Sequence, residues 1–126
     1  MPLTAESFRA YALELLTRCR LALDDADGAR QAAASAEASA AAVQLPLAHA
    51  WAQRAAAEVA LHTGAPAGAV ERALDSADRA EAVGAPLESA LSRALAGRAL
   101  AHGRDRDQPA GDDEALTDIQ QRQRAG

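Results

Sequence analysis

The sequence predicts an all-α protein built as a short stack of antiparallel helix pairs. The chain repeats itself at a spacing of forty residues, its apolar residues recur at helical spacing between Pro and Gly signals, and no segment shows the period-two alternation of a strand. With a shift of forty, residues 28–62 align with 68–102 without a gap. The informative identities are Gly28/Gly68, Val43/Val83, Pro46/Pro86, Leu47/Leu87 and His62/His102. We therefore expect an incomplete first unit, one full unit and a second that ends near residue 103.

Composition limits the kind of core that this stack forms. A chain of 126 residues has the size of one domain, and apolar residues make up 49% of it. Most of those residues are Ala, and a buried methyl group removes little apolar area from water. We expect a thin core with closely packed helices.

Charge and cysteine usage exclude several classes of protein. The net charge is −5, with acidic and basic residues interspersed, which argues against a nucleic-acid-binding surface. Cys19 is the only cysteine, so no internal disulfide forms and a reducing compartment is expected. The chain has neither an apolar run of eighteen residues nor the order of a signal peptide. We expect a cytoplasmic protein that binds neither nucleic acid directly nor a membrane.

The first two helices are predicted over residues 4–23 and 27–44. Thr4 is the N-cap candidate of the first helix. The second helix is almost entirely Ala, Ser and Gln, which favours helix formation but weak packing. The apolar stripe expected to face the core from the first helix consists of Phe8, Ala12, Leu15, Cys19 and Leu23.

Three prolines mark the starts of the later helices, because Pro at the first helical position loses no hydrogen bond. Pro46, Pro66 and Pro86 fit this position. Glycines then mark helix ends at Gly64, Gly84 and Gly103. The stripe of the helix from Pro66 is expected at Ala69, Val70, Ala73, Leu74, Ala77 and Ala80, and that of the helix from Pro86 at Leu87, Ala90, Leu91, Ala94, Leu95 and Ala99.

The pattern ends after Gly103, so residues 1–103 are predicted to form a helical-repeat domain. Residues 104–126 begin as a polar loop. A short helix with Leu116 and Ile119 as its apolar face is possible over 112–124. Two interpretations are open: this segment caps the last repeat, or it is disordered.

Residues 56–77 resemble a tetratricopeptide helical hairpin. Gly64 lies at the expected turn, and Ala69 and Ala77 occupy the small positions where the two helices of such a hairpin cross. Two features depart from the family: Ala60 and Ala73 replace its usual large aromatics, and the period is forty rather than thirty-four. The resemblance implies a short tetratricopeptide-like solenoid of about five helices.

A wider resemblance covers residues 10–107. The turn "GAPLE" and the helix "LAGRALA" are similar to the helical-repeat region of large LuxR-type transcriptional regulators from high-GC bacteria. The nucleotide-binding loop of those regulators, GxxxxGK[ST], and their helix-turn-helix are absent here. The resemblance implies that this chain corresponds to the repeat portion of such a regulator.

No pattern in the sequence predicts a catalytic, cofactor or metal site. His62 and His102 recur with the repeat near helix C-termini, where capping or surface roles account for them. His49 stands alone, and Cys19 lies on a predicted core stripe. The spacing of histidines and cysteines matches no metal motif. An enzyme that uses one of the histidines is a remote third hypothesis.

In tetratricopeptide arrays the first helix of each hairpin lines a concave groove. This resemblance implies a set of partner-binding residues: Tyr11, Arg18, Trp51, Arg54, Glu58, His62, Leu91 and Arg98. Tyr11, Trp51 and Leu91 share one register position. Two interpretations of that column are open: core anchors across successive repeats, or an apolar strip in the binding groove.

A solenoid buries each apolar face only against its neighbours, so a stack of about two and a half units leaves an end open. We expect this end, at Leu87, Leu91 and Leu95, to mediate homodimer formation, or the monomer to be marginally stable. The predicted function is a non-enzymatic module for protein interaction or signal sensing, part of or derived from a transcriptional regulator. The alternative is a stand-alone small-molecule-binding protein with an apolar pocket near Trp51 and Tyr11.

Overall fold

The computed structural model describes residues 5–107 and 121–124, and within these ranges it is all-α and contains no strand. A 3₁₀ turn, η1 (Ala5–Phe8), precedes five helices. These are α1 (Arg9–Ala22), α2 (Ala26–Val43), α3 (Pro46–His62), α4 (Pro66–Ala82) and α5 (Pro86–Asp107). The predicted fold class is confirmed.

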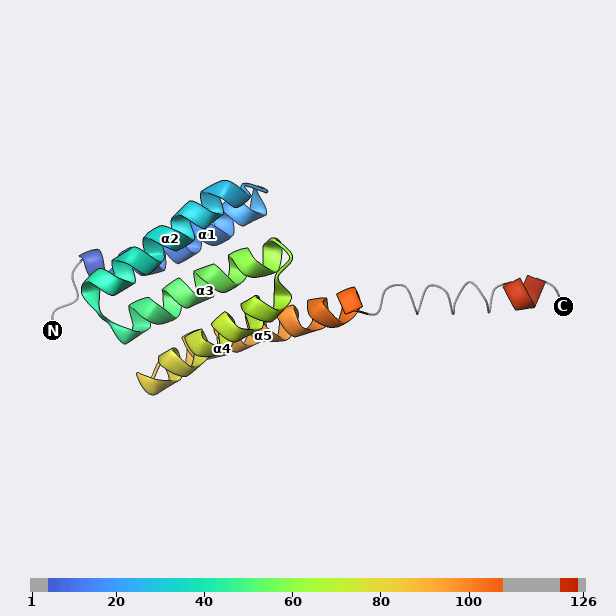
Figure 1. The fold of residues 1–126 in the computed structure, drawn as a ribbon. Helices are drawn as coiled ribbons and strands as arrows, with labels where there is room; N and C mark the ends of the chain where they lie inside the picture. Colours follow the sequence, from blue (N-terminus) through green and yellow to red (C-terminus); the bar gives the residue numbers. More distant parts are fainter. Residues whose placement is uncertain (1–4, 108–120, 125–126) are drawn as a thin grey trace.

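The helices form a stack of antiparallel neighbours. Helix α3 packs against α1 and α2 on one side and against α4 on the other, and α4 packs against α5 (Figure 1). Helices α2 and α4 begin forty residues apart, as do α3 and α5. The helix boundaries therefore repeat with the sequence, although α3 packs far more extensively against α1 than against α5.

The helix boundaries follow the expected local chemistry. Pro46, Pro66 and Pro86 are the first residues of α3, α4 and α5. Gly64 and Gly84 adopt positive φ angles of 87° and 73° in the turns after α3 and α4, a conformation that costs glycine little. These two turns let each helix reverse direction onto its neighbour.

Alanine supplies most of the core, as the composition predicts. Helix α2, expected to pack weakly, buries one face made almost entirely of methyl groups between α1 and α3. The fully buried alanines of the stack include Ala29, Ala36, Ala40, Ala48, Ala55, Ala57, Ala69, Ala73 and Ala77. Side chains of this size let the helix backbones approach closely, so the interior is filled without the large side chains of a Leu-rich core.

The predicted core stripe of α1 is wrong. Phe8, Ala12, Leu15, Cys19 and Leu23 are all exposed, and the buried face consists of Ser7, Ala10, Glu14 and Thr17 instead. Helix α1 is the first of the stack, so one of its sides has no neighbour within the described residues. The bulky stripe lies on that open side, while small and polar groups face α2 and α3.

The predicted stripe of α5 is confirmed at Leu95 and Ala99 and wrong at its other four positions. Leu87, Ala90, Leu91 and Ala94 are exposed, and the helix buries Ser89, Ser92, Leu95, Ala96 and Ala99. The hydroxyl groups of Ser76 and Ser92 lie 2.8 Å apart, and the Ser76 hydroxyl donates to the carbonyl of Ala50. Polar side chains can therefore occupy this helix crossing without an unpaired group.

The C-terminal boundary also differs. Helix α5 continues through Gly103 to Asp107, so the polar loop predicted from residue 104 does not begin there. Residues 121–124 are helical, while Thr4 and most of the predicted capping segment lie outside the described residues. None of the described helices combines the length and apolar content that a membrane crossing needs.

Candidate partner-binding groove

Opposite charges forty residues apart pair across the first helices of successive units. Arg54 of α3 contacts Glu14 of α1, with Nε 3.2 Å from Oε1. Arg98 of α5 contacts Glu58 of α3, with Nη2 3.2 Å from Oε1. These pairs place α1, α3 and α5 along one shared face, which we call the groove face.

Arg54 is the centre of a buried ionic cluster. Its side chain is 5% exposed and lies between Glu14, which is fully buried, and Glu88, 2.7 Å away. Arg18 contacts the same carboxylate oxygen of Glu14, with its Nε 2.8 Å from Oε1. Burial alone lowers the pKa of Arg54, but the charges and hydrogen bonds of Glu14 and Glu88 outweigh burial and raise the pKa above its ordinary value. Arg54 therefore remains a cation inside the fold.

The two aromatic rings of the predicted column are in contact at one end of the groove face. The centroids of Tyr11 and Trp51 lie 5.1 Å apart with the rings tilted by 55°. The indole N–H of Trp51 donates to Glu88 at 3.1 Å. Trp51 is only 7% exposed, whereas Tyr11 and Leu91 lie at the surface. Trp51 is a core anchor, and Tyr11 and Leu91 are the accessible members of the column.

Charged side chains occupy the other end of the groove face. The carboxylates of the two inter-helix pairs lie deep, with the side chain of Glu14 0% and that of Glu58 15% exposed. Two guanidinium groups lie outermost: that of Arg18, which pairs with Glu14 along α1 and is 44% exposed, and that of Arg98, which is 63% exposed. His62 lies nearby on α3, 3.5 Å from Asp24. This end therefore exposes two guanidinium groups, each paired with a carboxylate, together with the carboxylate of Asp24.

The structure brings the eight predicted partner-binding residues onto one face but gives them different exposure. Arg54 and Trp51 are enclosed by their own chain, and Glu58 is largely covered. The accessible members are Tyr11, Arg18, His62, Leu91 and Arg98. Sequence reasoning missed Glu88, which has no charged counterpart in register. The opposite charges forty residues apart are a signal in the sequence that could have revealed the inter-helix pairs.

A second polar cluster joins α3 and α4 away from the groove face. Asp75 accepts hydrogen bonds from Gln53 at 2.8 Å and from Arg79 at 2.7 Å. Partial burial raises the pKa of Asp75, but hydrogen bonds from Arg79 and Gln53 and the charges of Arg79 and His49 outweigh it, so the pKa lies below its ordinary value. Asp75 is therefore a stabilising carboxylate.

This depressed pKa predicts a loss of stability in acid. The contribution of Asp75 is present above the pKa of an unfolded Asp, about 4, and is lost as pH falls through the lower folded value. We expect Asp75→Asn to be less stable than the wild type at neutral pH, and this difference to shrink at a pH below the folded pKa. Urea unfolding at the two pH values measures it, with the exposed Glu71→Gln as control. A difference that does not change with pH would contradict the assignment.

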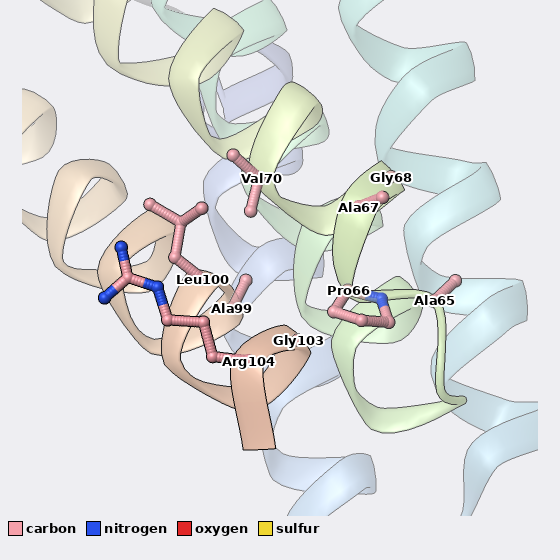
Figure 2. A pocket seen from close by; sticks show the side chains of 9 residues that line it. All are labelled: Ala65, Pro66, Ala67, Gly68, Val70, Ala99, Leu100, Gly103 and Arg104. Carbon is pink, nitrogen blue, oxygen red and sulfur yellow. The ribbon is translucent and has the colours of Figure 1, made fainter. Parts of the chain in front are cut away.

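A hollow of about 600 Å³ lies apart from the groove face, between the first turn of α4 and the last turns of α5 (Figure 2). Its lining is mostly apolar and small. The residues are Ala65, Pro66, Ala67, Gly68, Val70, Ala99, Leu100, Gly103 and Arg104. In Figure 2 the side chain of Arg104 extends beside Leu100.

Comparisons of the chain with protein-family models, with curated proteins and with solved structures give no match. Within the described part of the chain, no three His, Cys, Asp or Glu side chains form a group that could hold a metal ion. The class that the fold defines is an all-α stack of antiparallel helices.

Proposed function

We propose that this protein is a non-enzymatic module for protein interaction or signal sensing that docks a peptide segment of a partner on its groove face. The observation that carries the proposal is the shared register of α1, α3 and α5, which aligns accessible side chains from three helices. Interfaces of this kind use aromatic anchors and Arg more than other residue types. Tyr11, Arg18 and Arg98 supply those chemical groups, and Leu91 adds an exposed apolar side chain.

The chemistry of the groove face selects the partner. Tyr11 and Leu91 favour a bulky apolar side chain, and the outward guanidinium groups of Arg18 and Arg98 favour carboxylates. Leu91 and Arg98 are seven residues apart on one helix, a rise of about 10 Å. An extended peptide spans this length in about three residues. The partner segment therefore carries an apolar residue and an acidic residue three positions apart.

The role in a transcriptional regulator is supported by the resemblance of residues 10–107 to the repeat region of LuxR-type regulators. The neighbouring coding sequence tests this part of the proposal. An adjoining ATPase segment or helix-turn-helix in the same reading frame supports it, and a complete frame without either one opposes it.

The alternative function, a small-molecule pocket near Trp51 and Tyr11, has less support. The two rings touch, and the indole N–H is already bonded to Glu88. A ligand between them would have to separate the rings and break this hydrogen bond. The space that this alternative needs is filled by the protein itself.

Selection from a random peptide library against the full chain tests the docking proposal. We expect the enriched peptides to share an apolar and an acidic residue three positions apart, and to bind Leu91→Glu and Arg98→Glu at least tenfold more weakly, a loss of about 1.4 kcal/mol. Leu74→Glu is the control, because Leu74 is 41% exposed, close to the 46% of Leu91, but lies on α4. Equal binding to all three variants, or the absence of enriched peptides, would overturn the proposal.

A further inference from the structure

An exposed apolar face runs along α1, on the side of this helix that has no neighbour within the described residues. Its members recur at helical spacing and are all exposed: Phe8, Ala12, Leu15, Leu16, Cys19 and Leu23. The four large ones are between 36% and 80% exposed. At about 200 Å² for a fully exposed large side chain, they leave about 400 Å² of apolar surface, a size that often marks an interaction site.

The internal repeat shows which kind of element covers this face elsewhere in the stack. The equivalents of positions 8, 12 and 15 in α3 are Ala48, Ala52 and Ala55. All three are buried, and the first two belong to one cluster with Ala36 and Ala40 of α2. Helix α3 therefore uses this face to hold the antiparallel helix that precedes it.

Helix α5 uses the same face in the same way. Its equivalents of positions 12 and 15 are Ser92 and Leu95. The Ser92 hydroxyl lies 2.8 Å from that of Ser76 on α4, and Leu95 packs in one cluster with Ala73 of α4. Among these three helices, as far as the described residues extend, α1 is the one whose face is open. The occupant that fits it is therefore another antiparallel helix.

The side chains on the face of α1 select a second copy of α1 as this occupant. Phe8 and Leu15 stand where α3 carries alanines, and larger side chains hold two helix axes further apart. The occupant must therefore fill the wider gap with large apolar side chains of its own. The face is also symmetric about its midpoint, so an antiparallel copy places position 8 opposite 23, 12 opposite 19 and 15 opposite 16. Every apolar residue then meets an apolar residue, as a two-fold interface requires.

The ends of the face carry opposite charges that this pairing brings together. Arg9, next to Phe8, is exposed and belongs to none of the ion pairs among the described residues. Asp24 follows Leu23, and its side chain is 94% exposed although it contacts His62. In an antiparallel pair, Arg9 of each copy lies toward Asp24 of the other. A parallel pair would place like charges together.

We propose that this chain forms a two-fold homodimer in which the α1 helices of two copies pair antiparallel through this face. Leu15 and Leu16 of both copies lie at the axis, and Phe8 packs against Leu23 of the second copy. The two patches account for about 800 Å² of buried surface, which with the flanking side chains is at the low end for specific interfaces. The dissociation constant is therefore expected in the micromolar range.

This interface differs from the two surfaces discussed above. It contains none of the accessible members of the groove face, so dimer formation does not depend on peptide docking. It also lies at the other end of the stack from Leu87, Leu91 and Leu95, where the sequence predicts a homodimer. Of those three, Leu95 is buried against α4 and cannot contact a second copy.

Sedimentation velocity of the full chain over about 1–200 μM tests the proposal. We expect the wild type to become a dimer across this range. Leu15→Glu should raise the dissociation constant at least tenfold, because it buries carboxylates without partners at the axis. Leu23→Glu is a second variant with the same expected effect, and its 80% exposed side chain contributes little to the core of its own chain. Leu91→Glu, 46% exposed on α5, is the matched control and leaves the dimer unchanged.

Cys19 reports the orientation of the two helices. In the antiparallel pair the Cys19 residues of the two copies are offset by about 10 Å along the helix axis, too far for a disulfide. Oxidation with copper phenanthroline should therefore not cross-link the wild type. In Ala12→Cys the added thiol lies opposite Cys19 of the second copy, so the same treatment should give a covalent dimer.

Four results would overturn the proposal. A wild type that stays monomeric at about 200 μM would show that the face receives a helix of a different protein. Dimers that Leu15→Glu and Leu23→Glu form as well as the wild type, or that Leu91→Glu abolishes, would place the interface elsewhere. A cross-link in the wild type, or none in Ala12→Cys, would contradict the antiparallel pairing. Both α1 variants should still bind the selected peptides, so failure of the dimer and failure of peptide docking are distinguishable.

Discussion

Arg54→Met is expected to destabilise the fold by about 3–5 kcal/mol, because it removes the one cation between two carboxylates in the core. Glu14 is fully buried, and Glu88 is 20% exposed. Without Arg54, Glu14 keeps only Arg18, and the two carboxylates face each other across the vacated space. Methionine has a similar length, so the loss reflects charge more than volume. Urea unfolding followed by circular dichroism measures it.

Arg98→Met is the matched control. It removes the same group from the equivalent kind of pair forty residues apart, but Arg98 is 63% exposed. Exposed pairs contribute about 0–1 kcal/mol, so this variant should unfold close to the wild type. If Arg54→Met does not fold, Arg54→Lys is the second variant, because it keeps a positive charge between the carboxylates. Its loss in free energy of unfolding can then be measured instead. An Arg54→Met protein within about 1 kcal/mol of the wild type would contradict the central role of the cluster.

The helices could be predicted from the sequence because their signals are local. Pro at the first helical position and Gly at a positive φ act through the backbone of one or two residues, and Pro46, Pro66, Pro86, Gly64 and Gly84 all lie where this chemistry requires. The spacing of forty residues between matching Pro positions could likewise be read from the sequence, and it predicted that α3 and α5 begin forty residues apart. The prediction that a helix ends at Gly103 is wrong. Glycine ends a helix only where the chain turns, and α5 continues through this residue to Asp107.

Burial could not be predicted in the same way for α1 and α5. Both lie at the ends of the stack, so each has one face without a neighbour among the described residues. In a chain so rich in Ala, a stripe of Leu or Phe such as Phe8 and Leu15 does not identify the core side, since methyl groups pack the helix crossings equally well. The core side of α1 instead carries Glu14, whose partner Arg54 is forty residues away.

The groove face was predictable in part. Its location follows from the register of the first helices, which placed Tyr11, Trp51 and Leu91 in one column. The exposure of each of these side chains could not be predicted from the register, because it depends on contacts between side chains of different helices. Trp51 is covered by its ring contact with Tyr11 and by its hydrogen bond to Glu88. Sequence patterns carry no information about such contacts unless both partners recur with the repeat.

Ala36→Leu is expected to destabilise the fold by about 1–3 kcal/mol, because the helix crossing at this point has no room for three more carbon atoms. Ala36 is 0% exposed and packs in one cluster with Ala10, Ala40, Ala48 and Trp51. Helices held together through methyl groups cannot move apart at one crossing without loosening the contacts on both sides, since α2 packs against α1 and α3 together.

Ala34→Leu makes the same substitution two residues away on the same helix, where the side chain is exposed. Leu and Ala have similar helix propensities, so this control should unfold within about 0.5 kcal/mol of the wild type. The difference between the two variants in urea unfolding therefore measures packing alone. If both lose the same small amount, the crossing tolerates larger side chains, and close approach through alanine is not what holds the stack together.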